Sequence, residues 1–107
     1  MTPTHYVLIN GYSNSYWDWG GEDDDLYIRF TMNNLQIYRA RNTTGVYAHT
    51  KHTRNKINIY RYIDLDKTKR RYKTDGLNSV AYKLVNITKK KLFTHILADI
   101  NPYNFPL

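Results

Sequence analysis

An acidic run followed by apolar residues at helical spacing is the first clear pattern along the chain. Four acids, Glu22-Asp23-Asp24-Asp25, precede a stretch in which Leu26, Ile28, Phe30 and Met32 are apolar. Carboxylates in the first turn of a helix are favoured by the positive end of the helix dipole. The pattern therefore predicts a helix from about Glu22 to Asn33.

Two stretches after this helix are typical of short strands. The stretch Leu35–Ala40 alternates apolar and polar residues, as a half-buried strand does. A loop containing Thr43-Thr44-Gly45 separates it from Val46–Ala48. We expect a strand at 35–40 and a second, shorter strand at 46–48.

From His49 to Lys73 the sequence is polar and basic, without a clear period. A connection of this length inside a compact domain is usually a functional lid or a disordered segment. We expect a long basic loop here, with room for some helix within it.

The last third of the chain is rich in branched and aromatic residues, which favour strands. These residues form two stretches, Val80–Ile87 and Leu92–Ile100, and Thr88–Lys91 between them suggests a hairpin. Strands and helices do not alternate regularly, so the pattern predicts an α+β fold. The strands look like part of a larger sheet.

Length and composition restrict the class of protein. The chain has 107 residues, 41% of them hydrophobic and 15% aromatic, which excludes a disordered segment of low hydrophobicity. A chain of this size buries a modest fraction of its surface, so we expect one core at most. The absence of cysteine excludes a disulfide framework and a thiolate metal site. Since no apolar run reaches about 18 residues and Met1–Asn10 does not resemble a signal peptide, we expect no membrane address in this chain.

The net charge of +7 is unevenly distributed. Most lysines and arginines lie between Lys51 and Lys91, and five of the nine acids lie in the first quarter of the chain: Asp18, Glu22, Asp23, Asp24 and Asp25. The basic runs Lys67–Lys73 and Lys89–Lys91, with tyrosines interleaved, raise the alternative of a nucleic-acid-binding module. No recognised motif accompanies them, and the acidic cluster would repel phosphate, so we expect no nucleic-acid partner.

The segment Tyr16–Asp25 concentrates two indoles, two glycines and four consecutive acids. Adjacent carboxylates repel one another and need compensation from a helix N-terminus, a cation or a ligand. A sugar would use all of these groups, because carboxylates accept hydrogen bonds from hydroxyls and an indole packs on the apolar face of the ring. One carboxylate could also take the proton of an attacking hydroxyl. The alternative is a solvated first helical turn, with Trp17 and Trp19 in the core.

A second candidate site is His49-Thr50-Lys51-His52, where two imidazoles three residues apart can contact one cation if the backbone turns between them. The alternative is a pair of exposed histidines without a ligand. The spacing by itself does not decide between them.

Three groups of residues resemble motifs of the beta-1,4-galactosyltransferases, and together they span about Thr4 to Ile100. The first joins Asn10-Gly11-Tyr12 to Tyr16-Trp17-x-Trp19-Gly-Gly-Glu-Asp-Asp-Asp25, with Asp18 where a glycine is common. The second, Gly45-x-x-x-His49-x-x-His52-x-Arg54, is similar to the metal-ligand segment, with His49 where a Met is frequent. The third is Arg61-Tyr62-x-x-Leu65-x-x-Thr68-Lys69, followed by Asp75-Gly76-Leu77-Asn78-Ser79.

The resemblance implies a fold and a domain. Residues 1–107 would be the C-terminal portion of a GT-A-like α/β glycosyltransferase domain, with a short helix after the acidic motif, a few strands and a long basic loop. This portion would bind the acceptor and the metal, whereas the donor-binding half and the membrane anchor would lie upstream in a type II Golgi enzyme. The triplets Asn42-Thr-Thr44 and Asn86-Ile-Thr88 match the glycosylation sequon and are compatible with a lumenal setting.

The resemblance also implies roles for individual residues. Asp23 would be the base that deprotonates the acceptor hydroxyl, and Arg61, Tyr62 and Leu65 would surround the N-acetyl group of a terminal N-acetylglucosamine. The implied acceptor site is Trp19, Gly21, Glu22, Asp23, Asp24, Arg61, Tyr62 and Leu65. The implied donor contacts are Trp19, His52, Thr53, Arg54 and Asn55.

His49 and His52 would hold a divalent ion, by resemblance Mn²⁺. An imidazole in place of the usual thioether suits several first-row ions, so the metal preference could differ from that of Met-bearing relatives. The implied reaction is metal-dependent, inverting transfer of galactose or N-acetylgalactosamine from a UDP-sugar to the 4-hydroxyl of N-acetylglucosamine. The chain alone is expected to be inactive, and a sugar-binding remnant that transfers nothing is the alternative.

Overall fold

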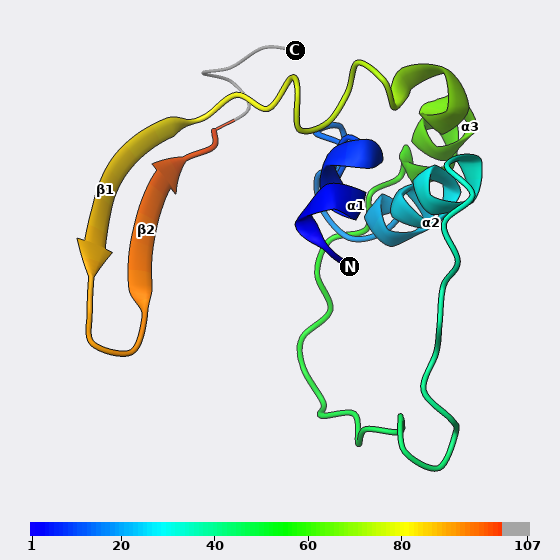
Figure 1. The fold of residues 1–107 in the computed structure, drawn as a ribbon, viewed down its shortest axis with the longest axis horizontal. Helices are drawn as coiled ribbons and strands as arrows, with labels where there is room; N and C mark the ends of the chain where they lie inside the picture. The colour runs from blue at the N-terminus through cyan, green and yellow to red at the C-terminus, as the bar shows by residue number, and fades with distance from the viewer. Residues whose placement is uncertain (102–107) are drawn as a thin grey trace.

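The computed structural model describes residues 1–101, which form three helices and one β-hairpin (Figure 1). The helices are α1 (Pro3–Leu8), α2 (Glu22–Met32) and α3 (Arg61–Arg71). The strands are β1 (Lys83–Lys89) and β2 (Thr94–Asp99), which pair antiparallel. The three helices lie together, and the hairpin stands apart from them. The radius of gyration is 16.4 Å, against about 13 Å for a compact domain of 100 residues, so the molecule is open.

Helix α2 begins at the acidic run, as expected. Glu22, Asp23, Asp24 and Asp25 occupy its first turn, where the helix dipole favours negative charge. The helix ends at Met32, one residue before the predicted end. The prediction of this helix is confirmed.

Helix α1 was not predicted, although its start has a sequence signal. The Thr2 hydroxyl accepts a hydrogen bond of 3.2 Å from the backbone amide of His5, and Pro3 follows at the first helical position. Thr before Pro is a common way to begin a helix, because the hydroxyl satisfies a free amide and proline presets the backbone.

The predicted strands at 35–40 and 46–48 are wrong: both stretches are irregular, and all of their residues except the half-buried Leu35 are exposed. They belong to a long loop that leaves the end of α2, extends away from the helices and returns to α3 (Figure 1). Alternation alone cannot make a strand, because a strand also needs a partner for its backbone hydrogen bonds. Among residues 1–101 no such partner lies beside 35–40.

The basic segment from His49 to Lys73 is irregular only in its first part. Helix α3 occupies Arg61–Arg71, so the basic segment contains the helix for which the prediction left room, and the irregular loop ends before it. The predicted hairpin is confirmed, with Ile87 opposite Ile96 and Lys89 opposite Thr94. An irregularity in the pairing lies between Leu84 and Asn86.

The interior of the helical part is mostly polar. Ile9 is the one buried apolar side chain among the described residues. Asp25, Arg29 and Thr68 are fully buried, and Asp75 is nearly so. The helices are therefore joined chiefly by hydrogen bonds and ion pairs, with little apolar packing in the part of the chain that the structure describes.

Candidate functional site

A cavity of about 220 Å³ lies where the N-termini of α2 and α3 meet. Its lining combines the acidic motif with two residues from the start of α3: Trp19, Gly20, Gly21, Glu22, Asp23, Asp24, Arg61 and Tyr62. Seven of the eight residues of the implied acceptor site are in this set. The structure thus brings together segments that are about forty positions apart in the sequence.

Leu65 is the implied acceptor residue outside this lining. It is half-buried on α3, one turn after Arg61. Its expected contact with an acetamide group therefore stays a prediction.

Gly21 allows the sharp change of backbone direction at the start of α2. It precedes α2 with a φ of +101°, a left-handed conformation that side chains rarely adopt. A Cβ atom there would lie 2.7 Å from Cε1 of Tyr16 and 3.0 Å from Cβ of Arg61. The missing side chain lets α3 approach the motif, which places Arg61 beside the carboxylates.

Arg61 and Tyr62 form one unit at the start of α3. The Arg61 guanidinium lies 4.5 Å from the centre of the Tyr62 ring, and its Nη1 donates a 3.1 Å hydrogen bond to the carbonyl of Asn58. These contacts hold a cation and an aromatic face on the wall of the cavity opposite the acids. The site therefore offers acceptors, a donor and apolar ring surface, which is the set of groups that a sugar uses.

Trp19 ties the cavity to the loop that carries the histidines. Its backbone amide donates to the carbonyl of Lys56 (2.9 Å), and its carbonyl accepts from the amide of Asn58 (3.0 Å). Lys56 also forms an exposed ion pair with Asp18, at 3.5 Å. Trp17 and Trp19 are 46% and 57% exposed, so the alternative that the two indoles are core residues is wrong.

Asp25, the last acid of the run, is structural. Its carboxylate is 2.6 Å from Nε of Arg29 and accepts a 2.5 Å hydrogen bond from the hydroxyl of Thr68 on α3. Tyr16 donates to the same carboxylate at 3.4 Å. Burial, together with the nearby Asp25 charge, raises the pKa of Tyr16 to about 12 and outweighs the opposing effect of its bond to Thr68. Of the four consecutive acids, three line the cavity and one fixes α2 to α3.

A second polar centre lies at Asp75, and sequence reasoning did not assign it a structural role. Asp75 accepts from the hydroxyl of Ser13 and from the amide of Asn14 (2.8 Å), and it lies 2.9 Å from Nε of Arg71. Arg29 reaches the same carboxylate at 3.6 Å. The sequence did mark this position, because Asp75 begins the Asp75–Ser79 segment that resembles the family.

Asn10 joins the same two regions of sequence. Its amide nitrogen donates to the carbonyl of Tyr72 (2.9 Å), and its amide oxygen accepts from the backbone amide of Asn78 (3.0 Å). Arg29 donates to the carbonyls of Asn10 and Gly11, at 3.4 and 3.2 Å. The first motif and the segment after α3 therefore hold each other in place.

Apart from Trp19, the implied metal and donor residues lie outside this cavity. His49, His52, Thr53, Arg54 and Asn55 are exposed in the loop before α3, and none of them lines it. The contacts that join this segment to the site are made by Lys56 and Asn58, with Trp19, Asp18 and Arg61.

The two histidine rings lie close enough together for both to contact one ion. Their ring centres are 5.4 Å apart, and Nδ1 of His52 lies 3.0 Å from the carbonyl of Thr53. A hydrogen bond at Nδ1 leaves Nε2 as the ligand, which is usual for metal-bound histidine. No group of three His, Cys, Asp or Glu gathers within the described residues.

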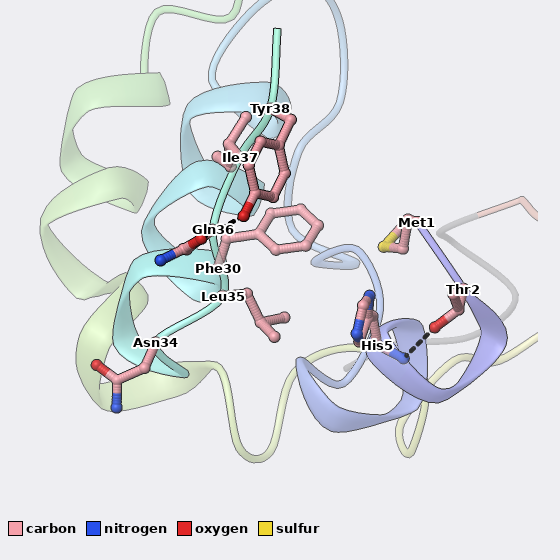
Figure 2. A pocket seen from close by; sticks show the side chains of 9 residues that line it. All are labelled: Met1, Thr2, His5, Phe30, Asn34, Leu35, Gln36, Ile37 and Tyr38. Atoms are coloured by element: carbon pink, nitrogen blue, oxygen red, sulfur yellow. Dashed lines mark hydrogen bonds between the residues drawn. The ribbon is translucent and has the colours of Figure 1, made fainter.

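A larger hollow of about 550 Å³ lies elsewhere and has a different character (Figure 2). It lies between α1, the end of α2 and the start of the loop, and Phe30, Leu35 and Ile37 contribute much of its surface. None of the residues implied by the resemblance lines it. The described residues include no helix that is long and apolar enough to cross a membrane.

Comparisons with known proteins agree with these motifs. A family model described as the N-terminal domain of galactosyltransferase matches residues 1–53. Beta-1,4-galactosyltransferase 4 of Cricetulus griseus is 42% identical over 102 residues, which are 92% of this chain and 30% of that protein. Beta-1,4-galactosyltransferase 2 of Homo sapiens is 36% identical over 110 residues, which are 99% of this chain and 30% of that protein. The chain thus spans about a third of the length of these relatives.

Solved structures show the same fold. The catalytic domain of Drosophila beta-1,4-galactosyltransferase 7 in complex with xylobiose matches with a TM-score of 0.70 and 25% identity, over 96% of this chain and 48% of that one. A mutant of that enzyme in complex with manganese, UDP-Gal and xylobiose matches with the same score and coverage at 24% identity. The predicted α+β fold of a glycosyltransferase domain is confirmed. From its motifs, its relatives and its fold, the chain belongs to the beta-1,4-galactosyltransferase family of glycosyltransferases.

Proposed function

We propose that residues 1–107 are the acceptor- and metal-binding part of a longer beta-1,4-galactosyltransferase. The longer enzyme would transfer galactose or N-acetylgalactosamine from a UDP-sugar to the 4-hydroxyl of a terminal N-acetylglucosamine. The observation that carries this proposal is the cavity in which Trp19 and Asp23 meet Arg61 and Tyr62. The complex of a solved relative with manganese, UDP-Gal and xylobiose supports a nucleotide-sugar donor and a sugar acceptor.

Asp23 acts as the general base in this proposal. It is the central one of the three acids that line the cavity, and it is exposed to an incoming hydroxyl. Its carboxylate takes the proton of the acceptor 4-hydroxyl as the oxygen attacks the anomeric carbon of the donor. A single displacement of this kind inverts the configuration at that carbon, without a covalent enzyme intermediate.

The neighbouring groups orient the acceptor. Glu22 and Asp24 accept hydrogen bonds from sugar hydroxyls, and the half-exposed Trp19 indole covers the apolar face of the ring. Arg61 donates to the acetamide oxygen, while Tyr62 and Leu65 bound the acetamide methyl group. Correct orientation of the hydroxyl contributes to rate as well as to affinity.

His49 and His52 hold a divalent ion, with manganese as the expected species, and the longer protein supplies the remaining ligands. When bound, this ion stabilises the negative charge of the leaving diphosphate as a Lewis acid. Thr53, Arg54 and Asn55 lie beside these histidines and contact the donor, together with Trp19. The hydrogen bonds from Trp19 to Lys56 and Asn58 couple this segment to the acceptor site.

The setting of the longer enzyme would be the Golgi lumen, with a type II membrane anchor outside this chain.

A second function follows from the cavity lined by Trp19, Asp23 and Arg61. Because the acceptor groups meet within these residues, the chain could bind N-acetylglucosamine without transferring anything to it. A nucleic-acid partner is disfavoured, since Glu22, Asp23 and Asp24 surround the cavity with negative charge.

A thermal-stability titration tests the proposal, because a ligand that binds the native state must stabilise it. The purified chain is titrated with a methyl glycoside of N-acetylglucosamine, with and without manganese, and the matched ligand is the glucoside that lacks the acetamide. Saturable stabilisation by the first sugar, reduced for the second and lost in Arg61→Ala, supports the acceptor assignment. Equal effects of both sugars, or none, would overturn it.

A further inference from the structure

The loop between α2 and α3 contains a tight turn around Asn42. The backbone amides of Thr44 and Gly45 both donate to the carbonyl of Arg41, at 2.9 Å each. Asn42 and Thr43 therefore stand at the tip of the turn, and both are exposed. In Figure 1 this loop extends away from the three helices and from the hairpin.

The side chains of this turn are arranged for modification. Asn42, Thr43 and Thr44 form the triplet Asn-x-Thr, with a threonine in the middle position. Within residues 1–101 no hydrogen bond engages the Asn42 amide. The Thr44 hydroxyl donates to the carbonyl of Arg41 at 3.3 Å, so its oxygen remains able to accept a hydrogen bond.

The other Asn-x-Thr triplet of the chain has a different environment. Asn86 lies within strand β1 and pairs with Leu97 on β2. Its amide nitrogen donates to the hydroxyl of Thr88 at 3.2 Å. Backbone pairing and this bond hold Asn86 in an extended segment, whereas Asn42 stands free at a loop tip.

We propose that Asn42 carries an N-linked glycan and that Asn86 does not. In this modification the amide nitrogen of Asn42 forms a bond to the anomeric carbon of a lipid-diphosphate-linked oligosaccharide. The bond from that carbon to the diphosphate oxygen breaks, the lipid diphosphate leaves, and one amide proton is lost to a base of the transferring enzyme. This proposal rests on the proposed function in one respect: both require that the chain enters the lumen of the secretory pathway.

The folded chain accommodates a glycan at this position. Asn42 does not line the cavity of Trp19 and Asp23, and the loop that carries it extends away from the helices before it returns to α3 (Figure 1). The same loop exposes Tyr38 and Tyr47 almost completely. A bulky, hydrophilic group between them would cover apolar surface and leave sugar binding unchanged.

Translation of the full chain behind a cleavable secretory signal, in the presence of microsomes, tests the proposal. For the natural sequence we expect a decrease in electrophoretic mobility that corresponds to one glycan, and an endoglycosidase should reverse this step. Asn42→Gln and Thr44→Ala should lose this step. Thr43→Ala and Thr44→Ser are matched controls that keep the triplet intact, and they should retain the step, as should Asn86→Gln.

Three outcomes would overturn the proposal: no step although a control glycoprotein is modified, a step that persists in Asn42→Gln, or a second step removed by Asn86→Gln. Because the secretory signal brings the chain into the microsomal lumen, these outcomes do not depend on whether the protein transfers galactose. The sugar titration of the unmodified chain tests the proposed function separately.

Discussion

Thr68 on α3 donates a 2.5 Å hydrogen bond to the carboxylate of Asp25 on α2, and both side chains are fully buried. This bond fixes the second half of α3 against the first turn of α2. As a consequence, Arg61 and Tyr62 face the acids Glu22–Asp24 across the cavity. The geometry of the acceptor site therefore depends on a hydrogen bond that no substrate would touch.

Thr68→Val should destabilise the chain and loosen the cavity. The substitution keeps the volume but leaves a buried carboxylate oxygen without this partner, which costs about 1–3 kcal/mol. Urea unfolding measures the loss of unfolding free energy. Thr74→Val is the control, because Thr74 is exposed and bonds only to the nearby carbonyl of Arg71. Equal stability of the two variants would contradict the structural role of Thr68.

Gly21→Ala should weaken both stability and sugar binding. A side chain at a φ of +101° costs on the order of 1–3 kcal/mol, and its Cβ would meet Tyr16 at 2.7 Å. The same urea series, combined with titration of the N-acetylglucosamine glycoside, measures both effects. Gly45→Ala, in the exposed loop, should leave sugar binding unchanged. Retained affinity in Gly21→Ala would argue against the close approach of α3 to the motif.

The pH dependence of stability should carry a contribution from Tyr16. The pKa of this phenol is raised from 10.0 to about 12 on folding, so its contribution is complete below pH 10 and is lost as the pH rises toward 12. Tyr16→Phe should therefore reduce the loss of unfolding free energy between pH 10 and 12. Tyr47→Phe, at a position that is 90% exposed, is the control. If both variants follow the natural chain, Tyr16 is not the group responsible.

Asp23→Asn in the longer enzyme should abolish transfer and leave the fold intact. The amide cannot accept the proton of the attacking hydroxyl, whereas it keeps the size of the carboxylate. Transfer to an N-acetylglucosamine glycoside is measured together with the melting temperature. Asp18→Asn is the control, because Asp18 belongs to the same motif but does not line the cavity. Full activity of Asp23→Asn would refute the assignment of the base.

Removal of both imidazoles should weaken manganese binding without unfolding the chain. His49 and His52 are exposed, so His49→Ala with His52→Ala should change the melting temperature little. In the longer enzyme, isothermal titration with manganese should show the affinity falling by at least tenfold. His5→Ala, on α1, provides a histidine control. Unchanged affinity would place the metal elsewhere.

The sequence predicted helix α2 and the hairpin, because interactions between residues close in sequence determine these two elements. The acids at the start of α2 favour that helix, and the branched residues flanking Thr88–Lys91 favour the hairpin. Helix α3 has few apolar residues, and contacts such as that of Thr68 with Asp25 hold it in place. Such contacts join residues 43 positions apart, and a sequence pattern of short range does not reveal them.

The candidate site shows the same limit. The chemistry of Tyr16–Asp25 indicated a sugar site from residue types alone, but only the family resemblance connected it to Arg61 and Tyr62. Neither the residue types nor the family resemblance predicted that Arg29 and Asp75 are buried, because a polar interior does not produce a periodic sequence pattern. Charged residues in a sequence are usually exposed, and these two are exceptions.

Chemical-shift mapping of the full chain with the N-acetylglucosamine glycoside shows whether the cavity of Trp19 and Arg61 binds the sugar. The cavity of Trp19 and Arg61 and the hollow of Phe30 and Leu35 share no residue, so the amide signals distinguish them. The account predicts saturable shifts at Gly20, Gly21, Asp23 and Arg61. Shifts centred on Phe30 and Leu35, or none at saturating sugar, would contradict it.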